Sequence, residues 1–366
     1  MVIEVDVAIV GARVGGSVAA ALLGEAGYRV VLVDATTFPS DTISTHFFRG
    51  AGFGSVLVRL GLLDAVLGLG SPPLTCQYEF NGANPTSKIG PPQDPGDLGY
   101  CLSVRRGPLD QLLVERARTT AGVEVLEGAT ARSVLWDGER VSGLIVEHRG
   151  VSEEIRAQLV IGADGRSSAV ARWLGAPVER RETATRAMYY RYVRGFRGPD
   201  GSWDGPEFSL QGDELVYAFP SDDDLTCIAV SVNLDVFTTF RRGPEAMFNE
   251  RIAAHPGLAT RYAAAVPHGR MLGSGPKDAL VRTPAGPGWA LVGDASLNQD
   301  PWTGLGMDNA GMHAVFLAEA VDAWLSGGTT EDEALTRYRR RRDEHAMAGF
   351  IATAELGRDL SVLVGE

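Results

Sequence analysis

Lysine, cysteine and long apolar runs are scarce in this sequence of 366 residues. Lysine occurs only at positions 88 and 277, so arginine carries nearly all of the positive charge, and the formal net charge is −12. A chain with this balance lacks the basic surface that attracts nucleic acids and anionic membranes. We therefore expect neither of them among its partners.

Cysteine and histidine show none of the spacings that bind metals. The three cysteines form no CxxC pair, and the six histidines form no HxxxH or HExxH arrangement. We expect no metal site, and free thiols in a reducing compartment. No apolar run reaches the length of a membrane span, and the first apolar run has the pattern of a buried strand rather than of a signal peptide. These absences predict a cytoplasmic protein with no membrane span.

The first 34 residues contain the strongest pattern. Residues 5–10 are an apolar run typical of a buried parallel strand, residues 17–26 carry small and apolar side chains at helical spacing, and residues 29–34 form a second apolar strand. Glycines separate the first strand from the helix, and an acid ends the second strand about 20 residues past the first glycine. In this context the glycines predict a dinucleotide-binding unit.

Each residue type in this unit has a physical task. Gly11 allows a tight turn, Gly16 lets the helix approach the strand closely, and the free amides at the helix start receive a diphosphate. Asp34 is placed to accept hydrogen bonds from a ribose. Arg13 stands where the pattern has its middle glycine, so the diphosphate lies farther from the backbone there, and Gly15 supplies part of the missing room.

Two later segments place polar residues where ligands bind in open sheets. Arg106 lies just ahead of a predicted helix, and Asp164 with Gly165 follows the apolar strand 155–161. Ligands of open α/β sheets sit outside the carboxyl ends of the strands, which is where Asp164 is expected. Each segment also has a structural interpretation, as a solvated arginine and as an ordinary turn.

A third segment combines a strand end with a helix start. Residues 289–294 form an apolar strand that ends in Asp294, and a loop with Pro301, Gly304 and Gly306 then opens a long helix. The amides at a helix N-terminus form a positive pole, which suits a ligand edge that gains negative charge. Plain packing of the helix is the alternative.

The pattern between residues 180 and 285 is different. Segments such as 188–192, 214–219 and 226–232 alternate or carry β-branched and aromatic residues, and Pro and Gly separate them. This predicts an antiparallel sheet. We therefore expect a discontinuous nucleotide domain, residues 1–180 and 285–366, and a substrate domain, residues 181–284.

Taken in order, these motifs resemble those of the FAD-dependent oxidoreductases typified by p-hydroxybenzoate hydroxylase. That superfamily also includes geranylgeranyl-reductase-like enzymes and flavin halogenases. The resemblance covers roughly residues 1–175 and 285–330. It implies an α/β protein: a Rossmann-type FAD-binding domain with a βαβ core, an antiparallel-sheet substrate domain and C-terminal helices.

The resemblance also implies cofactor-binding roles, with FAD as the cofactor and NAD(P)H as the electron donor. Ser296 departs from the histidine common at its position, which leaves that contact undefined. The implied residues are Gly11, Arg13, Gly16 and Asp34 at the ADP half, Ala131 near the adenine, Arg106 at the phosphate or ribityl portion, Asp164 and Gly165 in the G-A-D-G motif, Asp294 at the ribityl chain or diphosphate, and Pro301, Gly304, Gly306 and Met307 at the isoalloxazine.

The reaction that the resemblance favours is monooxygenation with O2. A flavin C4a-hydroperoxide would oxygenate an aromatic, polyketide-like or alkene small molecule, as a hydroxylase or an epoxidase, and this agrees with the absence of an evident catalytic triad or carboxylate pair. The alternatives are a flavin-dependent reductase of carbon–carbon double bonds, a flavin halogenase, and FAD binding without turnover. A halogenase is expected to carry W-x-W-x-I-P, whereas residues 217–220 are Tyr-Ala-Phe-Pro. The oligomeric state, monomer or dimer, stays open.

His46 is the candidate catalytic side chain. In the resembled family the loop after the second strand passes near the isoalloxazine, so His46 could position or protonate a substrate. The alternative is a histidine whose nitrogens are satisfied by hydrogen bonds within a turn. Tyr190, Arg191, Phe208, Tyr217 and Phe219 face either the substrate or the core, and alternation alone does not separate the two.

Overall fold

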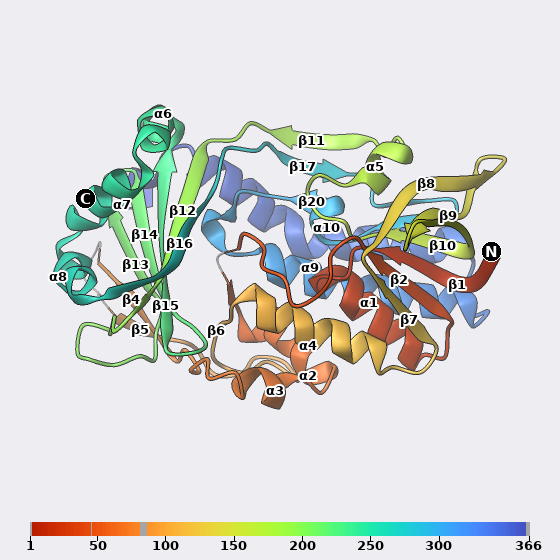
Figure 1. Cartoon of the computed structure of the whole chain (residues 1–366), viewed down its shortest axis with the longest axis horizontal. Helices are drawn as coiled ribbons and strands as arrows, with labels where there is room; N and C mark the ends of the chain where they lie inside the picture. The colour runs from red at the N-terminus through yellow and green to blue at the C-terminus, as the bar shows by residue number, and fades with distance from the viewer. Residues whose placement is uncertain (1, 45, 81–85, 364–366) are drawn as a thin grey trace.

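The computed structural model describes residues 2–44, 46–80 and 86–363, and two large sheets lie at opposite ends of an elongated molecule (Figure 1). The first sheet has the parallel order β19, β10, β1, β2, β7. The predicted strand–helix–strand unit at the N-terminus is confirmed, and β19 adds to the far side of β10. The strands of this sheet are β1 (Val2–Val10), β2 (Val30–Asp34), β7 (Val123–Glu127), β8 (Ala129–Asp137), β9 (Arg140–His148), β10 (Val151–Gly162), β18 (Ala285–Gly286) and β19 (Trp289–Leu291).

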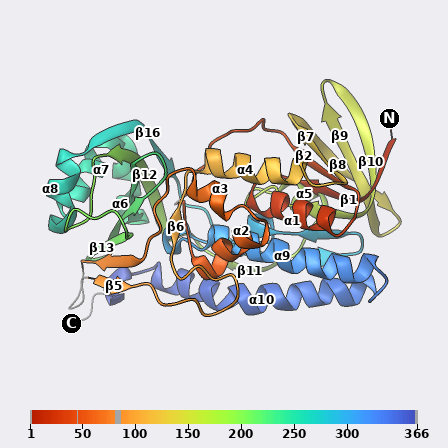
Figure 2. The same cartoon turned by 90° about the horizontal axis from the view of Figure 1, so that it is seen from below.

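Helices cover one face of this sheet and a hairpin covers the other. Apolar side chains of α1, α4 and α9 share a core with one face of β1 and β2, whereas the opposite face packs against the β8–β9 hairpin and α5. The Asp137-Gly138 turn joins β8 to β9, as its composition predicts. Figure 2 shows α9 and α10 side by side along the molecule. The helices are α1 (Val14–Glu25), α4 (Arg106–Arg118), α5 (Ala169–Trp173), α9 (Gly306–Leu325) and α10 (Glu331–Leu356).

The second sheet is largely antiparallel and has seven strands in the order β16, β12, β15, β14, β13, β4, β5. Three helices, α6 to α8, pack on its outer face. Two strands, β4 and β5, come from the segment before residue 100 rather than from 181–284, and the division into two domains stays a prediction. The elements are β4 (Cys76–Glu79), β5 (Thr86–Lys88), β12 (Arg186–Arg194), β13 (Glu207–Gln211), β14 (Glu214–Pro220), β15 (Leu225–Asn233), β16 (Val266–Ser274), α6 (Leu234–Arg242), α7 (Pro244–Ala253) and α8 (Pro256–Ala264).

Small strands connect the two large sheets. A three-stranded sheet has the order β11, β17, β20, and β3 pairs with β6. None of the helices within the described ranges is both long and apolar enough to cross a membrane. The connecting strands are β3 (Phe47–Phe48), β6 (Leu102–Ser103), β11 (Val178–Glu182), β17 (Ala279–Arg282) and β20 (Leu297–Asn298).

The segment from Arg49 to Leu67 does not form one continuous helix. A wide turn over Gly50–Gly54 precedes α2 (Ser55–Arg59) and α3 (Leu63–Leu67). Gly52 has non-helical dihedrals, and a Cβ there would lie 2.4 Å from the Asp308 carboxylate. Gly61, with φ +67°, ends α2. Tertiary contacts with α9 therefore override the helical periodicity of this segment.

Candidate functional site

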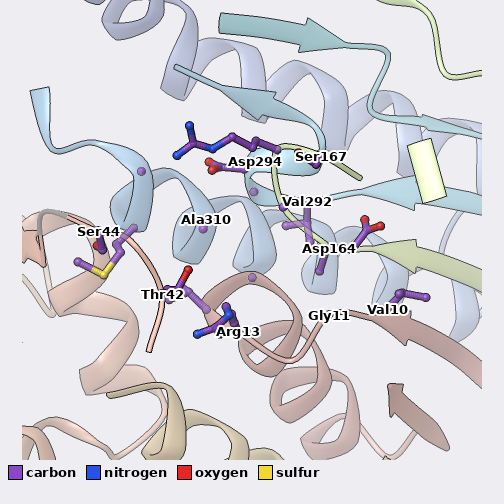
Figure 3. A pocket seen from close by; sticks show the side chains of 18 of the residues that line it. Val10, Gly11, Arg13, Thr42, Ser44, Asp164, Ser167, Val292, Asp294 and Ala310 are labelled. Atoms are coloured by element: carbon purple, nitrogen blue, oxygen red, sulfur yellow. The ribbon is translucent and has the colours of Figure 1, made fainter. Parts of the chain in front are cut away.

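A cavity of about 580 Å³ lies along the carboxyl ends of the parallel strands. It is lined by the ends of β1, β2 and β10 and by the residues that follow β19. Figure 3 shows Asp294 and Arg13 on opposite sides of this cavity, with Thr42 and Ser44 toward one end and Val10 toward the other. Strand ends of this kind are the place where ligands bind in open α/β sheets.

The structure brings the predicted cofactor residues together in this cavity. Gly16 is the exception, because it packs beneath the turn instead of lining the cavity. That these residues bind FAD stays a prediction. The predicted residues that line the cavity are Gly11, Arg13, Asp34, Arg106, Ala131, Asp164, Gly165, Asp294, Pro301, Gly304, Gly306 and Met307.

The glycine turn requires both of its outer glycines. Gly11 has φ +103°, and a Cβ there would lie 2.5 Å from the carbonyl oxygen of Ala163. A Cβ on Gly16 would lie 1.8 Å from the carbonyl oxygen of Gly11, a separation that no side chain can occupy. These contacts bring α1 close to β1 and the turn close to the loop after β10. The amides at the start of α1 therefore border the cavity.

Arg13 directs its side chain toward α4. Its Nη1 donates to Asp110 Oδ2 over 2.5 Å, and its Nη2 donates to Ser40 Oγ over 3.0 Å. Arg106 donates twice to the same carboxylate, Nε to Oδ1 and Nη2 to Oδ2, each over 3.0 Å. Asp110 is fully buried. One buried carboxylate thus holds two arginines at the cavity wall. This role was not predicted from the sequence, although Arg106 and Asp110 have the helical i,i+4 spacing.

The carboxylates at the ends of β2 and β10 are both used by the backbone. Asp34 accepts hydrogen bonds from the amides of Ala12 and Thr36, over 2.7 and 2.8 Å. Asp164 accepts from the amides of Ala169 and Val170, over 2.7 and 3.1 Å, at the start of α5. Each carboxylate has lone pairs beyond those bonds, but the Asp164 side chain serves first as a helix cap.

Asp294 is half-buried, and the charges of three arginines act on it. Burial raises the pKa of its carboxyl, whereas the positive charges of Arg166, Arg106 and Arg282 act in the opposite direction. Arg166 lines the same cavity and was not predicted from the sequence. Ser296, which stands in place of the family histidine, accepts a hydrogen bond from the buried Arg342 over 2.9 Å. It therefore belongs to the packing of α10.

Two helix starts face the cavity without a side-chain cap from any described residue. Gly15 of α1 and Gly306 with Met307 of α9 line the cavity. The first amides of a helix have no partner within the helix, and they carry the positive end of its dipole. The cavity therefore offers two sets of free amides for negatively charged or electron-rich groups.

Aromatic side chains of the second sheet pack behind Phe47 of β3, which lines the cavity. Phe47 lines the cavity and stacks on Phe219, with ring centroids 5.1 Å apart. Phe208 and Tyr217 pack edge-on beside them, and the Tyr217 hydroxyl donates to the Trp302 carbonyl. Tyr190 belongs to the same buried cluster. We call these five rings the aromatic wall: Phe47, Tyr190, Phe208, Tyr217 and Phe219.

Arg191, the other predicted sheet residue, lies on the opposite face of the sheet. Its guanidinium pairs with Glu245 at the start of α7, over 2.7 Å. Alternation along β12 thus places Tyr190 in the buried cluster with Phe47 and Phe219, and Arg191 toward α7. The structure separates two residues that the sequence treated alike.

The structure does not bring His46 to the cavity. Its ring is 1% exposed, and Nδ1 donates to the Ser44 carbonyl over 2.6 Å. Nε2 therefore accepts from the Tyr192 hydroxyl. Burial, reinforced by the charge of Arg106, lowers the pKa of His46 to about 3. A neutral ring with both nitrogens satisfied favours the structural interpretation, and a catalytic role for His46 stays a prediction.

Asp300 is a carboxyl group of the site that was not predicted from the sequence. It lines the cavity beside Pro301, and its Oδ1 accepts from the Trp302 amide over 3.1 Å. Burial raises the pKa of Asp300 to about 6. Among the described residues, no three histidine, cysteine or acidic side chains lie close enough together to hold a metal ion.

Comparison with known proteins gives one family and several similar folds. A family model described as "FAD binding domain" matches residues 4–351 of this chain. Digeranylgeranylglycerophospholipid reductase 1 of Methanococcoides burtonii is 26% identical over 345 residues, which are 92% of this chain and 79% of that protein.

Two solved structures share the fold. The myxobacterial chondrochloren halogenase CndH superposes with a TM-score of 0.85 at 24% identity and covers 96% of this chain and 83% of its own. PqsL of Pseudomonas aeruginosa, described as a probable FAD-dependent monooxygenase, superposes with a TM-score of 0.77 at 23% identity. The match covers 99% of this chain and 96% of the PqsL chain. At these identities the likeness concerns the fold alone.

Proposed function

From the premise that the chain belongs to the FAD binding domain family, we propose that FAD lies along the cavity with its diphosphate at the glycine turn. The protein is an FAD-dependent oxidoreductase, and the predicted superfamily is confirmed. The fit rests on observations of the cavity itself: a turn that excludes any Cβ at Gly11, uncapped amides of α1 and α9, and arginines held by a buried carboxylate.

We assign five of the predicted residues to parts of that cofactor. Asp34 accepts hydrogen bonds from the adenosine ribose, and Arg106 contacts the phosphate or ribityl portion. Asp294, at the other side of the cavity, holds the ribityl chain. The amides of Gly306 and Met307 face the pyrimidine edge of the ring system, which becomes more negative when the flavin is reduced.

The reaction that we propose is monooxygenation of an apolar, aromatic or polyene molecule bound against the aromatic wall. FAD supplies the redox chemistry by taking a hydride from NAD(P)H and passing electrons to O2. The balance is one substrate C–H, O2, NAD(P)H and one proton giving the hydroxylated product, water and NAD(P)+. One oxygen atom enters the substrate and the other leaves as water.

The neutrality of the aromatic wall carries this proposal. Phe47, Phe208 and Phe219 have no ionisable group, burial raises the pKa of Tyr190 and Tyr217 far above neutrality, and His46 behind them is neutral. Phe47 is the member of the wall that lines the cavity, where it can stack on an apolar ring, and the packed rings behind it keep charge and water away from that place. The wall supplies no acid or base to a substrate carbon, which oxygen transfer does not require.

Similarity to the digeranylgeranylglycerophospholipid reductases favours a second candidate, reduction of a carbon–carbon double bond. Its balance is one alkene, NAD(P)H and one proton giving the saturated product and NAD(P)+, without O2. The aromatic wall also suits an isoprenoid chain, because both ligands bury apolar surface.

Oxygen consumption separates the two candidates. Protein reconstituted with FAD is incubated with NADPH or NADH and either 1-naphthol or geranylgeraniol, in air and under nitrogen, and the products are examined by mass spectrometry. Monooxygenation predicts a naphthol product with one atom from labelled O2, and none under nitrogen. A saturated geranylgeraniol product formed equally well under nitrogen would overturn monooxygenation in favour of the reductase. Protein that takes up no FAD would overturn both.

A further inference from the structure

Asp300 lies between the main cavity and a second, much smaller void. The void has a volume of about 10 Å³, and Asp300 and Gln299 line both spaces. The far side of the void is formed by β11, β17 and α10, and there Thr183 and Lys277 are exposed. The Asp300 side chain therefore separates the flavin end of the main cavity from a space beside the protein surface.

The lining of the void is suited to water. Its volume is about what one water molecule needs. Gln299 Oε1 is buried and accepts no hydrogen bond from any described residue, while its amide nitrogen donates to Thr303 and Thr353 over 3.1 and 3.3 Å. Buried acceptors are nearly always satisfied. We therefore expect a water in this void that hydrogen-bonds to Gln299, Thr353 and Asp300.

The pKa of the Asp300 carboxyl, about 6, lies closer to neutral pH than that of an ordinary aspartate. Burial raises its pKa, whereas the Trp302 amide and the charges of Arg186 and Arg166 act against burial. Tyr217 lies near the carboxyl on the side of the second sheet, and burial keeps this phenol neutral. The remaining charged groups are Glu182 and Lys277, which line the void.

Both candidate reactions consume one proton per turnover, and the aromatic wall provides no group that can supply it. We propose that Asp300 is the group through which protons pass from solvent to the flavin end of the cavity, by way of the void beside Gln299 and Thr353. The Asp300 carboxylic acid gives its proton to the reacting molecule bound at the flavin end of the cavity, and a water in the void, which regains a proton from solvent, returns one to the carboxylate. No electron moves in either step. The proposal rests on FAD in the cavity and holds for either candidate function.

The first test measures the reduction potential of bound FAD against pH in the wild type and in Asp300→Asn. Asn keeps an acceptor for the Trp302 amide, so the turn is preserved. The slope of the wild-type potential changes near pH 6, and the slope of Asp300→Asn does not. Asp64→Asn, an exposed carboxylate in the first turn of α3, is the control and behaves like the wild type. A break near pH 6 that persists in Asp300→Asn overturns the proposal.

The second test concerns turnover and the route. We expect kcat of Asp300→Asn to fall about 100-fold or more with little change in KM, and formate, a small acid that enters the cavity, to restore part of it. Ala184→Leu, which fills the void, slows turnover about tenfold and leaves the break in the potential at the same pH. A normal rate in Ala184→Leu shows that protons enter elsewhere and overturns the route. Failure to bind FAD at all would instead overturn the proposed function.

Discussion

The two ends of the cavity are built by different means. At the glycine turn the shape depends on backbone contacts and on paired charges: Gly16 touches Gly11, and Asp110 holds Arg13 and Arg106. At the aromatic wall the shape depends on packed rings, with Phe47 stacked on Phe219. The first end admits almost no variation in residue type, whereas the second keeps its apolar character under many substitutions.

This difference assigns the two ends to separate tasks. A cofactor with a diphosphate requires free amides, a tight glycine turn and positive charge at fixed places. A substrate requires only an apolar surface of the right shape. Changes at the glycine turn should therefore lower FAD affinity, and changes at the aromatic wall should alter turnover while FAD stays bound.

The largest effect is expected for Gly16→Val. Its Cβ would lie 1.8 Å from the Gly11 carbonyl oxygen, so α1 has to move away from β1. We expect a loss of more than about 4 kcal/mol in the free energy of unfolding and no bound FAD. Gly27→Ala is the control: Gly27 has φ +94° but no atom within 4 Å of the added Cβ, so we expect a cost of about 1–2 kcal/mol and normal FAD absorbance. Normal FAD binding in Gly16→Val would contradict the packing argument.

Asp110→Asn should have the next largest effect. It leaves the guanidinium groups of Arg13 and Arg106 without their buried counter-charge, and breaking a buried ion pair costs about 3–5 kcal/mol. We expect a lower free energy of unfolding, measured by denaturant titration, and weaker FAD binding, measured by the fluorescence of released FAD. Glu115→Gln removes an exposed pair with Arg118 in the same helix and should cost less than about 1 kcal/mol. Equal costs for the two variants would show that Asp110 is not a structural anchor.

The glycine end could be predicted from the sequence because its physics is local. Gly11 and Asp34 lie within one strand–helix–strand unit, and the spacing alone indicates how they meet. The position of Asp294 at the same edge of the sheet could be inferred only because another apolar strand ends in an acid. The structure confirms that this strand, β19, joins β10. Strand ends of one parallel sheet share an edge, so positions far apart in the chain meet there.

The aromatic wall and the proton route could not be predicted in the same way. Alternation in β12 separates two faces, but only the packed sheet shows that Tyr190 joins the buried cluster of Phe219 and that Arg191 pairs with Glu245 on the other face. The raised pKa of Asp300 depends on burial, and its proposed role depends on a void formed by β11, β17 and α10. No local pattern encodes either feature. His46 lies in a segment without periodicity, and its hydrogen bonds to Ser44 and Tyr192 are visible only in three dimensions.

Tyr217→Phe tests the aromatic wall, with a smaller effect than at the glycine end. It removes the hydrogen bond to the buried Trp302 carbonyl, and an unsatisfied buried acceptor costs about 1–3 kcal/mol. We expect normal FAD affinity and a change in kcat, measured by NAD(P)H oxidation and FAD titration. Tyr189→Phe, on the opposite face and stacked on Phe240, is the matched control and should leave both unchanged. A fall in FAD affinity for Tyr217→Phe would remove the distinction between the two ends.

The smallest effect is expected at His46, where the loop of the glycine end meets the aromatic wall. The pKa of His46 is lowered to about 3 in the folded protein, whereas an unfolded chain binds a proton at this ring near pH 6.5. Between those values the unfolded state binds more protons, so the free energy of unfolding falls as the pH falls, by at most about 1.4 kcal/mol per pH unit. His46→Asn removes this titration, and asparagine tolerates the φ of +68° at this position.

We therefore expect the stability advantage of the wild type over His46→Asn to shrink by about 1–2 kcal/mol between pH 7 and pH 5, measured by urea unfolding at each pH. Burial also lowers the pKa of His313 and His345, but both are present in each protein, so their contribution cancels in the difference. An advantage that stays constant over this range would mean that the His46 ring takes up a proton in the folded state. Its Nε2 could then no longer accept from Tyr192, and the boundary between the two ends of the cavity would be charged instead of neutral.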